Sequence, residues 1–305
     1  MSATWRRVVR GLIAAALAVS VAAPAASAGP AVTPLVSTAW LEDNLGADGL
    51  VVLDIRGRTF ETGHVPGSVR SDYPGRWRAT IDGVPWSMPP VPDLEATIGA
   101  LGIGPDSSVV IVPAGTDATE LGGATWIYFV FKYLGHDAVA ILDGSWAAWV
   151  EEARPVATDA AAPVAASFTA SLRPEILVAT ADVAARVGTD TVLIDARSPA
   201  QYRGEETSQL VLRPGHIPGA VNFDNALTFD AATHRLLPPD AIRALLPAAA
   251  RDPATPAIVY CNSGHWSSIV WFVLHELLGY ADMRLYAGSM AAWSRIPELP
   301  VETGE

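Results

Sequence analysis

The sequence predicts an α/β protein built from two similar halves, each an open parallel sheet flanked by helices. Short β-branched runs alternate with helical patterns along the chain, which is typical of parallel α/β sheets. The same order of features then occurs a second time, which indicates an internal repeat. The chain of 305 residues is also longer than one hydrophobic core usually supports, so two domains of ordinary size are expected.

The repeat assigns the elements in order. The first half contains VVLDIRG, GHVPGSV, VVIVPAG and WIYFVFKYLGHDAVAILDGSWAAW, and the second contains VLIDARS, GHIPGAV, AIVYCNSG and WFVLHELLGYADMRLYAGSMAAW. In each half the β-branched runs predict strands, and the helical patterns that alternate with them predict the intervening helices. We therefore expect one domain at residues 29–155 and a second domain at residues 175–305.

Two segments lack this periodicity. Residues 156–174 are rich in alanine, proline and small polar residues, which is typical of a linker between domains. The stretch DGVPWSMPPVPDLE begins at Asp82 and contains four prolines. It is therefore predicted to form neither a strand nor a helix, and a helix is expected after it, near residues 94–101.

The first 28 residues are expected to be a secretory signal peptide. Three arginines precede an apolar run that ends in the small residues Ala26, Ser27 and Ala28, after which cleavage is expected. Pro24 and small residues interrupt the run before it reaches the ~20 apolar residues of a membrane span. The mature protein is therefore expected in the periplasm or outside the cell, without membrane attachment.

Composition argues against several classes of function. The formal net charge of -12 disfavours nucleic acid and anionic membranes as partners. Cys261 is the single cysteine, so an internal disulfide is excluded and any thiol chemistry uses this sulfur. The six histidines are scattered along the chain, so no metal site is expected.

The repeat allows one half to serve as a control for the other. Features in both halves are candidates for the fold, whereas features in one half are candidates for chemistry. The paired features are Asp54 and Arg56 with Asp195 and Arg197, His64 with His216, and Trp149 with Trp293. The Asp and Arg pairs are expected to tie neighbouring loops, and the histidines to order turns. Cys261, by contrast, is matched by Ala114.

Cys261 lies where a predicted strand passes into a predicted helix. Such a turn directs several backbone N–H groups at one point, and the helix adds its positive end, so an anion is stabilised there. Gly264 allows the backbone to curl without a Cβ clash. Because the thiolate is the reactive form of cysteine, Cys261 is the expected nucleophile. The alternative is a small buried apolar residue, as free cysteines often are.

These motifs resemble the rhodanese superfamily, in particular its tandem-domain sulfurtransferases, whose first domain lacks the cysteine. The resemblance rests on the Asp-x-Arg strand ends, GHVPG and GHIPG, the loop CNSGHW, and the segments LDGSWAAW and LYAGSMAAW. It implies two packed open sheets with the cysteine loop facing the cleft between them. It also implies transfer of sulfane sulfur through a Cys261 persulfide, without a cofactor, from a small donor to cyanide or a thiol. A protein acceptor is compatible with this scheme.

The resemblance also implies a set of binding residues. Carried over by position, the backbone N–H groups of the cysteine loop form the sulfur cradle, at Asn262, Ser263, Gly264, His265 and Trp266. Thiosulfate-type members typically have basic residues in place of the first two, whereas mercaptopyruvate-type members have the serine. The latter use it with a histidine and an aspartate, for which Asp72 is a candidate but no histidine is evident. Both donors therefore stay open.

Several further side chains are candidates for substrate contact. His265 and Trp266 are expected either to bind a small anion or to pack outward and hold the loop. Gln201 stands where tandem members often have a substrate-binding arginine. An arginine fork suits a sulfonate or carboxylate, and three arginines flank the insertion QYRGEETSQLVLR: Arg197, Arg203 and Arg213.

Arg203 is the preferred substrate contact among these arginines, followed by Arg197. The alternative for Arg203 is a solvated pair with Glu205 or Glu206. From the first half, Arg76, Trp77 and Arg78 are also candidates for lining the cleft.

Two alternative functions also use a cysteine at such a turn. A phosphatase of this fold needs an arginine in the cysteine loop to clamp phosphate, and the six residues after Cys261 contain none. A non-catalytic module that carries a persulfide to one protein partner fits a lone cysteine as well as an enzyme does. Repeated turnover would distinguish the enzyme from the carrier.

Overall fold

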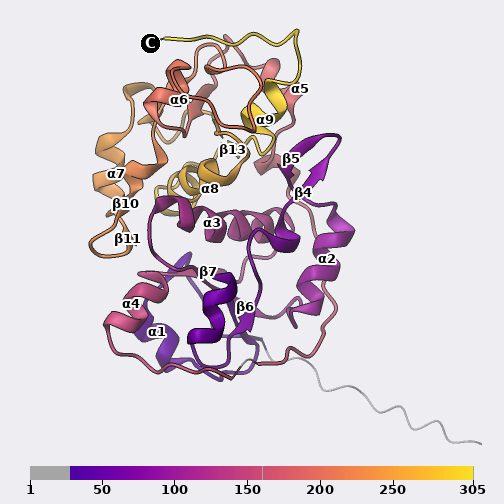
Figure 1. Cartoon of the computed structure of the whole chain (residues 1–305), viewed down its shortest axis with the longest axis vertical. Helices are drawn as coiled ribbons and strands as arrows, with labels where there is room; N and C mark the ends of the chain where they lie inside the picture. Colours follow the sequence, from indigo (N-terminus) through magenta and orange to yellow (C-terminus); the bar gives the residue numbers. More distant parts are fainter. Residues whose placement is uncertain (1–27, 160, 305) are drawn as a thin grey trace, which may run out of the picture.

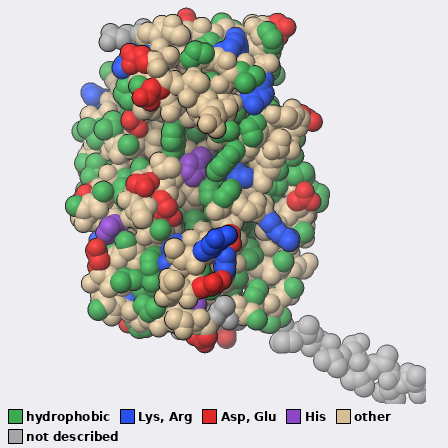
Figure 2. Space-filling view, in the orientation of Figure 1, with side chains coloured by type: hydrophobic (Ala, Val, Ile, Leu, Met, Phe, Trp, Pro, Cys, Tyr) green, Lys and Arg blue, Asp and Glu red, His purple; other side chains and the backbone are tan. Residues whose placement is uncertain are grey.

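The computed structural model describes residues 28–159 and 161–304, which form two stacked α/β domains (Figure 1). The predicted signal peptide lies outside the described residues, apart from Ala28. Within the described ranges, no helix has both the length and the apolar character that a membrane crossing requires. Acidic, basic and hydrophobic side chains are intermixed on the face shown in Figure 2.

The first domain contains a sheet of five parallel strands in the order β1-β7-β6-β2-β3. The strands are β1 (Leu35–Val36), β2 (Leu50–Asp54), β3 (Val69–Arg70), β6 (Ser108–Val112) and β7 (Val139–Leu142). The helices are α1 (Thr38–Asp43), α2 (Val91–Ala100), α3 (Ala118–Tyr133) and α4 (Ser145–Glu151), with 3-10 turns at Gly57–Thr62 and Gly75–Trp77. Strand β6 is buried along its whole length, as expected for an apolar parallel strand covered on both faces.

The second domain repeats this plan with four parallel strands in the order β13-β12-β8-β9. The strands are β8 (Val192–Asp195), β9 (Val221–Asn222), β12 (Ala257–Tyr260) and β13 (Met283–Leu285). The α-helices are α5 (Thr180–Ala184), α6 (Pro199–Arg203), α7 (Pro239–Leu245), α8 (His265–Trp271) and α9 (Ser289–Trp293). A π-helix at Phe272–Leu277 continues α8, and 3-10 turns lie at Pro174–Ile176, Asn225–Thr228 and Ala248–Ala250. The predicted fold class of two similar parallel α/β domains is therefore confirmed.

Two antiparallel hairpins supplement the sheets: β4 (Ala79–Ile81) with β5 (Val84–Ser87), and β10 (Phe229–Asp230) with β11 (Arg235–Leu236). The prediction that the proline-rich stretch from Asp82 forms neither strand nor helix is wrong at both ends, because β5 and the start of α2 lie within it. Pro85 is tolerated in a two-stranded hairpin, and Pro92 lies in the first turn of α2, where its missing N–H has no intrahelical partner to lose.

The predicted linker, residues 156–174, lies against the first domain. Its described part forms no helix or strand before the 3-10 turn that begins at Pro174. The side chain of Phe168 is buried, and the backbone N–H groups of Ala166 and Ser171 donate to the carbonyls of Gly99 and Leu134, each at 2.9 Å. The linker is therefore packed against the first domain and does not extend freely between the two domains.

One hydrophobic core extends through both domains. Helix α3 of the first domain packs against α8 of the second, close to the middle of the molecule (Figure 1). The rings of Phe129 and Trp271 meet edge to face with centroids 4.8 Å apart, and those of Tyr128 and Phe272 do the same at 4.8 Å. Because α8 begins directly after the cysteine turn, this packing positions the turn against the first domain.

The paired Asp and Arg residues have equivalent roles, as predicted. In each half the guanidinium binds the carboxylate two residues earlier and reaches a loop carbonyl at 2.8 Å. The groups are Arg56 with Asp54 and Gly63, and Arg197 with Asp195 and Gly215. These bonds tie the end of β2 or β8 to the following Gly-His turn.

The paired histidines order turns, also as predicted. His64 Nδ1 lies 3.0 Å from the carbonyl of Phe60, and its ring stacks on that side chain. His216 Nδ1 lies 2.8 Å from the carbonyl of Tyr202 and stacks on it in the same way. Because the histidine of the half without a cysteine makes the same contacts, we infer that both histidines serve the fold.

Candidate active site

Cys261 follows β12 and opens the turn that leads into α8. Its side chain is buried, with 1% of its surface exposed. Two donors contact the sulfur: the backbone N–H of Ser263 at 3.4 Å and the hydroxyl of Ser267 at 3.5 Å. Gly264 has φ +84°, a left-handed conformation that closes the turn and that glycine adopts without a Cβ clash. The turn therefore presents hydrogen-bond donors to the sulfur.

The equivalent turn of the first half holds an anion. There the N–H groups of Ala114 and Gly115 donate to the two carboxylate oxygens of Glu120, at 2.7 and 2.8 Å. Burial raises the pKa of Glu120, and these two bonds oppose the rise because they stabilise the carboxylate. Since Ala114 corresponds to Cys261, the same position of the fold accommodates a carboxylate in the half without a cysteine.

Ser289 braces the cysteine turn from the start of α9, a role that its motif LYAGSMAAW did not indicate. Its Oγ accepts hydrogen bonds from the N–H groups of Cys261 at 3.1 Å and Gly264 at 3.0 Å, and it donates to the carbonyl of Tyr286 at 2.8 Å. The N–H of Gly264 is therefore bound to Ser289 and does not face the sulfur, which corrects its expected place in the cradle. The available signal was the repeat, which pairs Ser289 with Ser145; both have left-handed φ values, +50° and +61°.

Side chains of the first domain cover the cysteine turn. Arg78 Nη1 donates to the carbonyls of Ser263 at 2.8 Å and Trp86 at 2.7 Å, and its Nε donates to the hydroxyl of Tyr73 at 2.9 Å. Trp86 belongs to the β4–β5 hairpin, which contacts α9 of the second domain. The cysteine turn therefore lies at the interface between the domains.

His265 contacts the first domain through both ring nitrogens. Nε2 lies 2.7 Å from the carbonyl of Thr119, and Nδ1 lies 2.9 Å from the hydroxyl of Tyr73. A carbonyl can only accept, so Nε2 carries the proton and Nδ1 accepts from the tyrosine. Gly122 permits this approach, because a Cβ there would lie 2.7 Å from Nε2. Of the two roles considered for His265, the geometry favours the one that holds the loop.

The contacts of His265 predict a pH dependence of stability. Burial, together with the charge of Arg78, lowers the pKa of His265 from 6.5 to about 4. Between these pH values the unfolded chain binds a proton that the folded protein excludes, so stability is complete above pH ~6.5 and declines as the pH falls to ~4. The melting temperature of the wild type should therefore decline over this range more steeply than that of His265→Gln. Parallel profiles from differential scanning fluorimetry would contradict the assignment.

Asn262 and Trp266 leave polar atoms unsatisfied beside the turn. Asn262 Nδ2 donates to Gln201 Oε1 at 2.8 Å, while its Oδ1 is buried and has no partner among the described residues. Trp266 as a residue is half-buried. Its indole Nε1 is buried and likewise has no partner within residues 28–159 and 161–304. The neutral Asn262–Gln201 pair occupies positions where the resemblance implies basic side chains in other members.

The arginines of the second half have other partners. Arg197 is buried, and two of its three guanidinium nitrogens, Nε and Nη2, are bound to Asp195. Arg203 forms a two-pronged pair with Glu205, with both distances 2.8 Å, which is the alternative considered for it. Arg213 donates to carbonyls of the C-terminal segment, among them those of residues 296 and 299.

The structure places the candidate residues of the first half in different surroundings. Arg78 reaches the cysteine turn, as described above. Trp77 is fully buried, and its Nε1 donates to Ser71 Oγ at 2.9 Å, so it belongs to the core and does not line a cleft. Asp72, the candidate partner of Ser263, instead binds the side chain of Arg70 at 2.6 Å.

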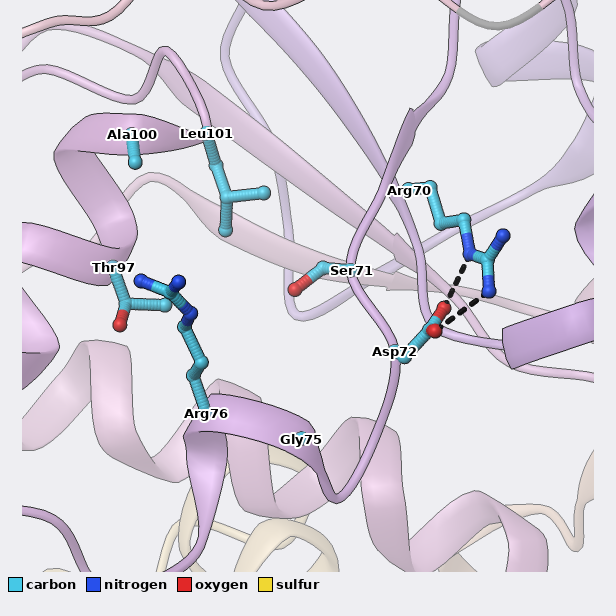
Figure 3. A pocket seen from close by; sticks show the side chains of 8 residues that line it. All are labelled: Arg70, Ser71, Asp72, Gly75, Arg76, Thr97, Ala100 and Leu101. Atoms are coloured by element: carbon cyan, nitrogen blue, oxygen red, sulfur yellow. Dashed lines mark hydrogen bonds and ion pairs between the residues drawn. The ribbon is translucent and has the colours of Figure 1, made fainter.

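Arg76 lines a hollow of about 430 Å³ on the first domain, together with Thr97 and Leu101 of the α2 region (Figure 3). The guanidinium of Arg76 extends toward Thr97, while the Arg70–Asp72 pair lies on the opposite side of the hollow. Cys261 and its neighbours do not line this space. The hollow is therefore distinct from the cysteine turn.

Comparison with known proteins agrees with this geometry. The model of the rhodanese-like domain matches residues 37–152 and 179–296. The thiosulfate sulfurtransferase of Azotobacter vinelandii is 31% identical over 270 residues, which cover 88% of this chain and 96% of the relative. The sulfur carrier protein TtuD of Thermus thermophilus is 31% identical over 291 residues, which cover 89% and 97%.

A solved structure shares the fold. The anaerobic ergothioneine biosynthesis enzyme from Chlorobium limicola, in complex with trimethyl histidine, superposes with a TM-score of 0.77. The superposition covers 89% of this chain and 70% of that enzyme at 23% sequence identity. The two domain matches and the nearly full-length alignments identify the family, and the shared architecture agrees with them. The chain belongs to the rhodanese-like family and is built from two tandem rhodanese-like domains.

Proposed function

We propose that this tandem rhodanese-type sulfurtransferase carries sulfane sulfur as a persulfide on Cys261 and confines the chemistry to its second domain. The pair of equivalent turns supports this most directly. One turn holds the Glu120 carboxylate through backbone N–H groups, and the other sets the Cys261 sulfur against N–H and O–H donors. A turn that accommodates an anion suits the thiolate and then the persulfide anion.

The transfer has two steps. The Cys261 thiolate attacks the outer sulfur of thiosulfate, the new Sγ–S bond forms, and the S–S bond of the donor breaks with its electron pair leaving on sulfite. Cyanide or a thiolate then attacks the outer persulfide sulfur, and the electron pair of the Sγ–S bond returns to Cys261. The donors at Ser263 and Ser267 would stabilise the negative sulfur at both stages.

The intact mass of the purified protein tests this proposal. Incubation with thiosulfate, or separately with mercaptopyruvate, should add one sulfur, and cyanide should remove it with many equivalents of thiocyanate formed per protein. The comparison of the two donors also identifies which is used. A mass that stays unchanged with both donors would refute loading by these small molecules.

Ser289→Ala is expected to lower the rate of sulfur transfer about tenfold, because two N–H groups of the cysteine turn lose a buried acceptor, each at ~1–3 kcal/mol. The melting temperature should also decline. Ser145→Ala is the matched control, since Ser145 occupies the same left-handed position in the half without a cysteine. Its transfer rate should stay within about twofold of wild type in a thiocyanate assay. Equal losses of rate in the two variants would contradict the bracing role.

A carrier that delivers sulfur to one protein partner is the second candidate. The similarity to the sulfur carrier protein of Thermus thermophilus favours it, as does the burial of Cys261 beneath first-domain side chains. A carrier would take up one sulfur per cysteine and then stall with cyanide or small thiols. The thiocyanate count in the mass experiment therefore separates the two functions.

We further propose that the protein is exported and cleaved after Ala28. The support is the sequence pattern of the first 28 residues. Intact mass of the native protein from the culture medium or periplasm should correspond to a chain that begins at Gly29. Recovery from the cytoplasm with residues 1–28 attached would refute export.

A further inference from the structure

Arg78 carries a charge at the domain interface that no carboxylate balances among the described residues. The three nitrogens of its guanidinium have different surroundings. Nε and Nη1 donate to uncharged acceptors, namely the hydroxyl of Tyr73 and the carbonyls of Trp86 and Ser263. Nη2 is buried and has no partner within the described part of the chain. The buried Arg56 and Arg197, in contrast, each bind an aspartate.

An unbalanced buried cation is costly, because burial removes the water that stabilises the charge. The pKa of Arg78 is accordingly lowered by burial, and the tyrosine hydroxyl and Cys261 oppose this effect. The ring of Trp126, whose centroid lies 3.3 Å from the guanidinium carbon, stabilises the cation partly through its π face. The remaining imbalance would be relieved by an anion at Nη2.

The cysteine turn is where such an anion would form. Arg78 is bonded to the carbonyl of Ser263, whose own N–H contacts the Cys261 sulfur. The turn from residue 262 to residue 268 contains no lysine or arginine, and its histidine, His265, has a lowered pKa and is neutral near pH 7. The first domain therefore supplies a cation that the turn itself does not contain.

Space for a small anionic ligand lies beside Arg78. The residue lines a hollow of about 360 Å³ that it shares with Trp86. This hollow lies beside β4, the strand that directly follows Arg78. Its lining belongs to the first domain, so a donor there would approach Arg78 from the first-domain side.

We propose that Arg78 is the cation of the active site, which balances the charge of the Cys261 thiolate and persulfide and binds the anionic end of the sulfur donor through Nη2. The ligand class is a small sulfonate-like or carboxylate-bearing sulfur compound. This inference rests on the proposed role of Cys261. It also accounts for the neutral residues Asn262 and Ser263, since the charge would come from the other domain.

Charge-selective alkylation tests the proposal without requiring sulfur transfer. Iodoacetate is an anion and iodoacetamide is neutral, yet the two are similar in size, so the ratio of their rates removes the effect of access to the buried sulfur. The single cysteine makes intact mass an unambiguous readout. Arg78→Gln should lower the iodoacetate-to-iodoacetamide rate ratio at least about fivefold relative to wild type. Arg78→Lys, which keeps the charge, should retain most of the wild-type ratio.

Arg76→Gln is the matched control, because it removes the same charge at a position two residues earlier in the chain. The Arg76 side chain lines a neighbouring hollow. Its rate ratio should stay within about twofold of wild type. A folded Arg78→Gln protein with the wild-type ratio would overturn the proposal. So would equal declines of the ratio in the two glutamine variants, because the effect would then be one of general surface charge.

A measurement on the wild type covers the case in which Arg78→Gln does not fold. Methanesulfonate, a sulfonate that does not react with iodoacetamide, should slow alkylation by this reagent at constant ionic strength, and an absence of protection would overturn the proposal. The outcome is also separable from the proposed function. A charge-dependent alkylation ratio in a protein that takes sulfur from neither donor would refute persulfide loading by these small molecules and retain the anion site.

Discussion

Replacement of Cys261 with serine is expected to reduce sulfur transfer by more than about a thousandfold while the protein stays folded. A hydroxyl is a far weaker nucleophile than a thiolate, and removal of a nucleophile generally costs several powers of ten in rate. The smaller side chain fits the same space, and its oxygen can still accept from Ser263 and Ser267. The melting temperature should therefore change by only a few degrees.

The first domain offers a stringent control for this variant. Ala114 is the counterpart of Cys261, so the double variant Ala114→Cys/Cys261→Ser moves the thiol to the equivalent turn. Transfer should not return, because the carboxylate of Glu120 already occupies the N–H groups of that turn. Thiocyanate formation measures both proteins. Activity in Cys261→Ser alone, with a single verified mass, would exclude Cys261 as the sulfur carrier.

The repeat explains why the fold was predictable from sequence. Each motif acts locally: Asp195 binds the arginine two residues later, and His216 reaches the carbonyl of Tyr202 in the adjoining turn. Contacts between residues that are close in sequence produce recognisable motifs. The second copy of each motif supports its interpretation. The position of Cys261 after β12 follows from the same local pattern.

The side chains that complete the site lie far from Cys261 in sequence. Arg78 and Tyr73 meet residues 263 and 265 across the domain interface, and Ser289 arrives from the start of α9. The positions of Arg78 and Tyr73 relative to the turn depend on how α3 packs against α8, which no local pattern specifies. Arg197 is the opposite case, because it belongs to a local motif and its Nε and Nη2 are bound to the paired Asp195.

The proline-rich stretch shows a related limit. Its four prolines disfavour regular structure, yet β5 forms there because a two-stranded hairpin needs few backbone donors. This hairpin carries Trp86, whose carbonyl accepts from Arg78. The exclusion of proline from central strands does not apply to this hairpin. The sequence pattern therefore did not predict β5, which covers the active site.

Gly264→Ala is expected to destabilise the protein and to disturb the cysteine turn. The left-handed φ of +84° costs an alanine about 1–2 kcal/mol. Its Cβ would also lie 2.9 Å from the ring of Trp126 and 3.0 Å from the carbonyl oxygen of Ala287, and such overpacking adds about 1–3 kcal/mol. The melting temperature should decline by about 5–15 °C. Transfer should slow at least about tenfold, because the turn and Trp126 must move apart.

Gly279→Ala separates the two causes. Gly279 has a similar φ of +75°, but a Cβ there would have no heavy atom within 4 Å apart from its own neighbours in the chain. This control should therefore show the backbone cost alone, a decline of about 2–6 °C in melting temperature, with a transfer rate close to wild type. If the two variants lost the same stability and activity, the approach of Trp126 to the turn would have no energetic weight. A larger loss of activity in Gly264→Ala would show that the first domain shapes the cysteine turn, although the nucleophile belongs to the second.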